Sequence, residues 1–257
     1  MVAAGAAGRG GAKLMLRLSD RKLLHVEGAD AAGGLLVAPA STIKPFTLMA
    51  LLEAGKLRSS DQFACSRHLR IGTHSLDCVH PAVPLPMNPA RAIAYSCNGA
   101  VAHFAERFEV DELPRALVRD GFASVTGLLQ GGEVTGEVKR NTVGAGSELQ
   151  ALGEEGIVVT PVELLLAYAR LAKRMGDPRY ASVLEGLEGA VEFGTAQGAR
   201  LTKCKVAGKT GSIAGAAWFA GFAPSRAPEV AVVVLVQGRS GGSDAAPVAR
   251  DLLSTVL

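Results

Sequence analysis

Segments that favour β-strands lie at both ends of the chain, and the segments between them favour helices. Near the start, residues 13–18 alternate apolar with polar side chains, and the pattern continues past a turn at 22–26, which predicts a β-hairpin. Near the end, short turns rich in Gly, Pro and Ser separate three apolar runs, at 205–211, 216–222 and 230–237. This order predicts one sheet assembled from the two ends of the chain.

The middle of the chain predicts helices. Residues 42–52 form an apolar, helix-forming run, and 89–108 look helical, with 96–98 either inside this helix or at a break in it. Residues 160–163 read TPVE, a capping box with proline at the first helical position, so we expect an apolar helix from there to about residue 175. A last helix is expected over about 245–257.

These segments together predict an α/β fold of the α+β type, with an antiparallel sheet flanked by helices and a mainly helical lobe beside it. We assign the sheet lobe to residues 12–40 and 200–257, the helical lobe to about 41–199, and a flexible, Ala/Gly-rich leader to 1–11. The chain has 257 residues, 48% of them hydrophobic, which is enough to bury a core without staples.

Charge excludes some classes of partner. Lysines and arginines number 27 against 24 acids and form no polybasic run, so we expect neither nucleic acid nor an anionic membrane as a partner. No stretch approaches the roughly 18 apolar residues that span a bilayer, and no signal peptide is visible. A small, neutral or anionic substrate suits this balance better.

The first chemical motif is S-x-x-K, which begins at Ser41 and ends at Lys44. Residues three apart lie on one face of a helix, so the ammonium group comes near the hydroxyl. Serine is a poor nucleophile at neutral pH, and a lysine whose pKa is lowered by burial can accept its proton. Alone, so short a motif is weak evidence of catalysis.

Two further motifs follow. Lys209, Thr210 and Ser212 place a cation and two hydroxyls along a strand, a cradle for a carboxylate, and Gly211 within it allows another backbone to approach. The plainer alternative is an exposed edge strand that carries a lysine to discourage aggregation. Residues 96–98, with the sequence SCN, are the third motif, for which a helix cap is the plainer alternative.

The order S-x-x-K, S-x-N, K-T-G is the set typical of penicillin-binding proteins and class A β-lactamases. On these motifs the chain resembles the transpeptidase domain of penicillin-binding proteins over roughly residues 35–250. Further segments resemble that family: 39–46 (PASTIKPF), 94–98 (AYSCN), 132–136 (GEVTG), 159–161 (VTP), 194–196 (GTA), 208–212 (GKTGS) and 217–224 (AWFAGFAP).

The resemblance implies an acyl-serine mechanism on the D-Ala-D-Ala stem peptide of peptidoglycan, as a D,D-transpeptidase or a D,D-carboxypeptidase. Ser41 would be the nucleophile, Lys44 its general base, and Ser96 the relay of a proton to the leaving amine. Asn98 would orient the substrate amide. If Lys209 also lines the site, burial and like-charge repulsion should both lower the pKa of Lys44.

For recognition, the resemblance implies that Lys209, Thr210, Gly211 and Ser212 hold the substrate carboxylate. The backbone N–H groups of Ser41 and Ser212 would form the oxyanion hole. β-Lactam antibiotics would acylate the same serine and act as inhibitors. No cofactor is implied.

The resemblance also implies an extracytoplasmic location in the periplasm or cell envelope, because cross-linkable stem peptides lie outside the inner membrane. Proteins of this family normally carry an N-terminal membrane helix and a pedestal domain, and neither fits in the residues before Ser41. We therefore expect membrane contact only through segments absent from this chain.

Two alternatives stay open. Glu137 and Asn141 have the E-x-x-x-N spacing with which class A β-lactamases position a deacylating water, so a serine β-lactamase is one alternative. Solvated loop charge is the plainer interpretation of these two residues. A non-catalytic β-lactam sensor or scaffold that keeps the fold is the other alternative.

A group of cysteines and histidines precedes the second motif. Cys65, His68, His74 and Cys78 have acceptable spacing for a tetrahedral zinc site, with His80 close behind. Cys65 and Cys78 can instead form a disulfide, or the group can be plain loop residues. Each of these roles is structural, because Ser/Lys acyl transfer needs no metal. Cys97 is interpreted as a small buried filler.

Overall fold

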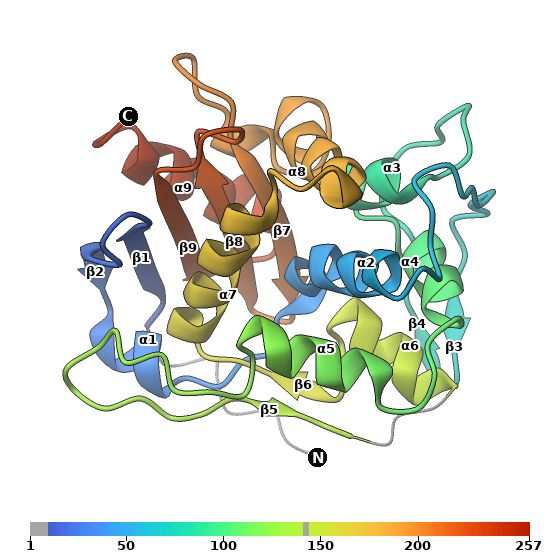
Figure 1. Ribbon diagram of the computed structural model, residues 1–257, viewed down its shortest axis with the longest axis horizontal. Coiled ribbons are helices and arrows are strands. Elements are labelled where there is room, and N and C mark those ends of the chain that lie inside the picture. Colours follow the sequence, from blue (N-terminus) through green and yellow to red (C-terminus); the bar gives the residue numbers. More distant parts are fainter. Residues whose placement is uncertain (1–9, 141–143) are drawn as a thin grey trace.

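Five strands form one antiparallel sheet in the order β2-β1-β9-β8-β7 (Figure 1). The computed structural model describes residues 10–140 and 144–257, so most of the predicted leader lies outside the described residues. The strands are β1 (Ala12–Arg17), β2 (Leu23–Glu27), β7 (Ala207–Ile213), β8 (Ala216–Ala223) and β9 (Val230–Gln237). The predicted antiparallel sheet, drawn from both ends of the chain, is confirmed.

Some helices cover this sheet and the others form a helical part beside it. The helices are α1 (Ala29–Gly34), α2 (Lys44–Glu53), α3 (Pro89–Ala94), α4 (Asn98–Ala105), α5 (Glu112–Asp120), α6 (Ala145–Leu152), α7 (Pro161–Arg174), α8 (Ala181–Glu192) and α9 (Ala246–Leu253). Two-residue strands pair locally as β3 (Arg70–Ile71) with β4 (His74–Ser75) and β5 (Glu137–Val138) with β6 (Ile157–Val158). Short 3-10 turns occur at Ala40–Ile43, Pro178–Tyr180 and Gln197–Ala199, and a π turn at Gly241–Ala245.

Both faces of the sheet are covered, because the central strand β9 is apolar on both sides. Alternate residues of β9 belong to two cores: Val233 packs in the core that includes α7, and Val232 in the core that includes α9. Figure 1 shows α7 crossing the front of the sheet and α9 near its upper end. The predicted division places all of 41–199 in a helical lobe, but α7 and α8 pack against the sheet.

The helical part is built around α2, whose residues Lys44 to Leu51 are all buried. Helices α4, α5 and α6 lie around it, and α5 and α6 appear in front of and below it in Figure 1. Of the two alternatives for 89–108, the structure shows the break, since α3 ends at Ala94 and α4 begins at Asn98. This break places Ser96 and Cys97 of the second motif in a turn, and Asn98 at the first position of α4.

The predicted capping box at the start of α7 is present. The Thr160 hydroxyl accepts from the Glu163 N–H at 3.2 Å, and the Glu163 carboxylate accepts from the Thr160 N–H at 2.9 Å. Glu163 is fully buried and also accepts from the backbone N–H groups of Ser124 and Gly136, at 3.0 and 2.9 Å. One carboxylate therefore joins the segment from Ser124 to Gly136 to the helix that covers the sheet.

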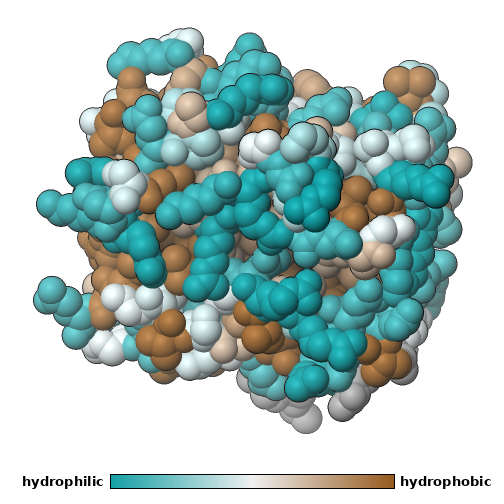
Figure 2. All heavy atoms as spheres, viewed as in Figure 1, coloured by the Kyte–Doolittle hydropathy of each residue, from teal (hydrophilic) through white to brown (hydrophobic). Residues whose placement is uncertain are grey.

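The surface in Figure 2 is hydrophilic over most of the visible face, and apolar side chains appear there in several separate patches. Across residues 10–140 and 144–257, the helices are too short or too polar to cross a membrane.

Candidate active site

The three motifs converge from three separate elements. Ser41 lies in the 3-10 turn Ala40–Ile43, and Lys44 is the first residue of α2, which continues that turn. Ser96 lies in the turn between α3 and α4, and Lys209 lies on the edge strand β7. Residues far apart in the sequence thus meet where the sheet edge joins the helical part.

Lys44 connects the first two motifs. Its Nζ donates to the Ser96 carbonyl oxygen at 2.9 Å and to Ser96 Oγ at 3.3 Å, and it also donates to Asn98 Oδ1. The side chain is fully buried, and burial lowers the pKa of Lys44 to about 8. A sizeable fraction of the Lys44 amine is therefore neutral near physiological pH, as a general base requires.

Lys209 approaches the same hydroxyl from the opposite motif. Its Nζ donates to Ser96 Oγ at 2.9 Å and to the Thr210 carbonyl at 2.9 Å. Burial, and after it the nearby charge of Lys44, hold the pKa of Lys209 well below its usual range. Like-charge repulsion is expected from the sequence to help lower the pKa of Lys44, but it lowers the pKa of Lys209 instead. The pKa of Lys44 is lowered by burial. A solvated edge lysine is excluded, since Lys209 is fully buried.

Ser96 is held in an unusual backbone conformation. Its φ is +55°, in the left-handed region that non-glycine residues rarely adopt. The flanking residues fix the turn: Cys97 caps α4 by accepting from the Ala100 N–H at 3.4 Å, and Asn98 Nδ2 donates to the Leu76 carbonyl at 3.0 Å. Such strain persists only where the surroundings impose it, which is common at functional sites.

The third motif presents its hydroxyls along β7. Thr210 Oγ1 donates to Thr195 Oγ1 at 2.9 Å, and Ser212 Oγ accepts from the Gly241 N–H at 3.0 Å. Thr195 received no role from the sequence, although its segment GTA is among those that carry the family resemblance. Its hydroxyl accepts the hydrogen bond of Thr210 and so helps to orient that side chain.

Ser41 is half-buried, in a turn that is anchored on both sides. The Trp218 indole N–H donates to the Ala38 carbonyl at 3.0 Å, and the buried Tyr168 hydroxyl donates to the Thr42 carbonyl at 2.8 Å. The Ala40 N–H also donates to the Gly153 carbonyl at 3.1 Å. A serine at a rigid helix start is a suitable nucleophile, because little freedom remains to be lost on reaction.

Gly211 lets β7 approach this turn closely. A Cβ at residue 211 would lie 3.0 Å from the Pro39 carbonyl oxygen and 3.3 Å from Ala40 Cβ. Replacement by alanine is therefore expected to push β7 away from Ser41 and to slow acylation by about tenfold or more. The accompanying loss of stability should be about 1–3 kcal/mol.

Labelling rates and thermal melting of the Gly211→Ala variant check this expectation. Gly176→Ala is a matched control, because nothing lies within 4 Å of a Cβ at that position. Acylation at the unaltered rate would show that the approach of β7 to the turn has no part in the chemistry.

Only Glu137 of the alternative β-lactamase pair lies within the described residues. Glu137 is exposed on β5, opposite Val158 in the two-stranded pairing with β6. Asn141 lies outside the described residues. This pair therefore gives no support for a deacylating water site.

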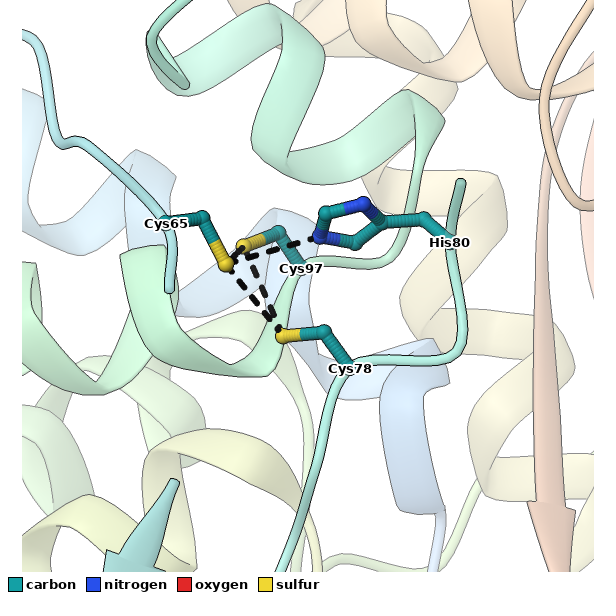
Figure 3. A group of neighbouring side chains, drawn as sticks. All are labelled: Cys65, Cys78, His80 and Cys97. Atoms are coloured by element: carbon teal, nitrogen blue, oxygen red, sulfur yellow. Dashed lines mark hydrogen bonds between the residues drawn. The ribbon is translucent and has the colours of Figure 1, made fainter. Parts of the chain in front are cut away.

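The cysteines and histidines that meet in the structure differ from those predicted. Two of the predicted ligands lie elsewhere, with His68 Nδ1 3.4 Å from an Asp77 oxygen and His74 Nε2 3.0 Å from a Glu155 oxygen. The residues that gather are Cys65, Cys78, His80 and Cys97, and we call them the Cys3His cluster (Figure 3). Cys97 is buried as predicted but is a member of this cluster rather than filler. All of its thiols are free, so the structure contains no disulfide at this place.

Comparisons with known proteins agree with this geometry. A family model described as penicillin binding protein transpeptidase domain matches residues 36–254. Stage V sporulation protein D of Bacillus subtilis is 25% identical over 84% of this chain and 41% of its own length. Peptidoglycan D,D-transpeptidase PbpA of Mycolicibacterium smegmatis is 26% identical over 85% of this chain and 55% of its own length.

The chain thus spans about half the length of the curated relatives it matches. A solved structure of Pseudomonas aeruginosa PBP2, in complex with WCK 5153, shares the fold with a TM-score of 0.85 and 22% identity. That match covers 97% of this chain and 74% of the other. With the family model matched over most of the chain, and with the motifs of that family gathered around the hydroxyl of Ser96, this chain belongs to the penicillin-binding protein transpeptidase family.

Proposed function

We propose that this chain is a D,D-transpeptidase that acts on D-Ala-D-Ala stem peptides of peptidoglycan through an acyl-serine intermediate on Ser41. The observation that carries the proposal is the placement of Ser96 Oγ between two buried lysine side chains, 3.3 Å from Lys44 Nζ and 2.9 Å from Lys209 Nζ. This arrangement can pass a proton between the nucleophile's base and a leaving group without bulk water.

In the acylation step, neutral Lys44 takes the proton of Ser41 while Ser41 Oγ attacks the carbonyl carbon between the two D-alanines. The resulting oxyanion is stabilised by the backbone N–H groups of Ser41 and Ser212. The C–N bond then breaks, and Ser96 passes a proton from the Lys44 ammonium to the departing amine. Terminal D-alanine leaves, and the rest of the stem peptide stays as an ester on Ser41.

Substrate recognition is assigned to β7. In the sheet order it is an outer strand, so an extended peptide can lie along its free side. Lys209 supplies the positive charge for the terminal carboxylate, and the hydroxyls of Thr210 and Ser212 supply hydrogen bonds. Asn98 orients the substrate amide.

The second step transfers the acyl group from Ser41 to an amine of another stem peptide. Attack by water instead would make the reaction a carboxypeptidation. The family and the name of the PbpA relative favour the transfer.

Because stem peptides that can be cross-linked lie outside the cytoplasmic membrane, we assign the domain to that side. Loss of the protein after protease treatment of intact spheroplasts would agree, and full protection would contradict the assignment.

Covalent labelling with a fluorescent penicillin tests the proposal. We expect one adduct per chain, located by peptide mass mapping on the peptide that contains Ser41, with slow release. An adduct on another residue, or none on folded protein, would overturn it. Rapid nitrocefin turnover would instead favour a β-lactamase, and labelling without any conversion of a D-Ala-D-Ala peptide would favour a sensor.

A further inference from the structure

The Cys3His cluster has the dimensions of a metal site. The three sulfur atoms lie 3.4 Å (Cys65 to Cys97), 3.7 Å (Cys65 to Cys78) and 3.7 Å (Cys78 to Cys97) apart. His80 Nε2 lies 3.6 Å from the Cys65 sulfur, and all four donor atoms lie within 4.8 Å of one another (Figure 3). A tetrahedron with Zn–S bonds of about 2.3 Å has S···S edges of about 3.8 Å. The spacing therefore nearly matches that of a zinc coordination shell.

Backbone N–H groups donate to the sulfurs and can stabilise thiolates, the form that binds a metal. Each sulfur accepts one backbone N–H: Cys65 from Arg67 at 3.3 Å, Cys78 from Gly99 at 3.4 Å, and Cys97 from Ala100 at 3.4 Å. Each sulfur thus has its own hydrogen-bond donor in addition to the three neighbouring donor atoms.

His80 is oriented as a metal ligand. Its Nδ1 lies 2.8 Å from the Pro81 carbonyl oxygen, which fixes the hydrogen on Nδ1 and leaves the lone pair of Nε2 directed at the sulfurs. The ring is only 4% exposed. A buried imidazole with this outer partner and three sulfurs in front of it matches the Cys3His donor set of structural zinc sites.

A disulfide explains the cluster less well. A bridge joins two sulfurs at about 2.05 Å and would leave the third thiol and the imidazole without a common role. The nearly equal spacing of the sulfurs, each with its own N–H donor, singles out no pair. A single central cation uses all four donors at once.

The cluster is joined to the catalytic residues by the chain itself. Cys97 lies between Ser96 and Asn98, and Asn98 Nδ2 donates to the carbonyl of Leu76, two residues before Cys78. We propose that the Cys3His cluster binds one Zn²⁺ ion, and that the bound ion holds the turn that presents Ser96 and Asn98 to Lys44. Binding releases the remaining thiol protons to solvent. The first half of the proposal, that the cluster binds Zn²⁺, is independent of the proposed function. The second half, that the ion holds the turn with Ser96 and Asn98, rests on the proposed function.

Metal analysis of the reduced full chain tests the first half. We expect about one zinc per chain after exposure to Zn²⁺ and gel filtration, by analogy with closed structural sites. Co²⁺ added to the metal-free protein should give thiolate-to-cobalt charge-transfer bands and the intense visible bands of a tetrahedral site. Failure to retain zinc, weak octahedral cobalt bands, or a Cys65–Cys78 disulfide as the stable reduced-buffer form would overturn it.

Variants assign the ligands. Cys78→Ser and His80→Ala should each lose the retained zinc and the tetrahedral cobalt spectrum. Cys204→Ser and His68→Ala are matched controls outside the cluster and should keep both. Circular dichroism of each variant shows whether it folds. Where a variant does not fold, the cobalt titration of the wild-type protein still tests the metal site. Loss of the spectrum in a control would contradict the assignment.

Acylation by fluorescent penicillin tests the second half. Removal of zinc by a chelator should slow labelling of Ser41 by about tenfold or more, since a misplaced catalytic group costs on this scale, and added Zn²⁺ should restore it. Unchanged labelling without zinc would overturn the coupling and leave the metal site standing. Zinc retained by a protein that never labels would instead contradict the proposed function.

Discussion

Replacing Lys44 by arginine is expected to slow acylation of Ser41 by about 10²-fold or more, the usual scale of general-base catalysis. Arginine keeps the charge that Ser96 and Asn98 contact, but its guanidinium stays protonated in proteins and cannot accept the serine proton. The observed rate constant for labelling by a fluorescent penicillin measures the effect.

The pH profile separates a base from a mere cation. The pKa of Lys44 is about 8, so its neutral fraction grows as pH rises towards that value. Wild-type acylation should therefore increase from pH 6 through about 8 and then level off, and the Lys44→Arg variant should lack this rise. Lys173→Arg, an exposed position on α7, is the control and should match the wild type. A near-normal rate for Lys44→Arg across this range would show that Lys44 is only an electrostatic support.

Much of the site follows from local sequence, because the spacing of a motif fixes its geometry once the element is known. Lys44 follows Ser41 by one turn, and the strand pattern around Lys209 is clear from its apolar neighbours. The break that exposes Ser96 could also be anticipated, since the polar triplet interrupts an apolar helical run. The motif spacing, the strand pattern and the break all depend on residues close together in the sequence.

The Cys3His cluster could not be derived in this way. The chain between its first two cysteines is a hairpin: β3 pairs with β4, and the Cys78 N–H donates to the Arg67 carbonyl at 2.8 Å. Cys65 and Cys78 therefore meet at the base of the hairpin, and His68 and His74 lie on its arms. The C-x-x-H spacing predicted His68 and His74 as ligands, which would require a compact local loop in place of the hairpin. His80 and Cys97 join only through tertiary packing.

Removing the hydroxyl of Ser96 should have an effect of similar size. Ser96→Ala is expected to reduce acylation by about 10²- to 10⁴-fold, because the proton then has no carrier between Lys44 and the leaving group. The two ammonium groups also lose the oxygen that both of them contact, at 3.3 and 2.9 Å. Stopped-flow labelling with a penicillin measures the loss.

Ser96→Gly separates this chemistry from the strain of the backbone. The φ of +55° suits glycine better than alanine, so the glycine variant should unfold with a free energy about 1 kcal/mol higher than the alanine variant. Both lack the hydroxyl, and both should therefore acylate equally slowly. If the glycine variant recovered most of the wild-type rate, the role of Ser96 would lie in the shape of its turn rather than in proton transfer.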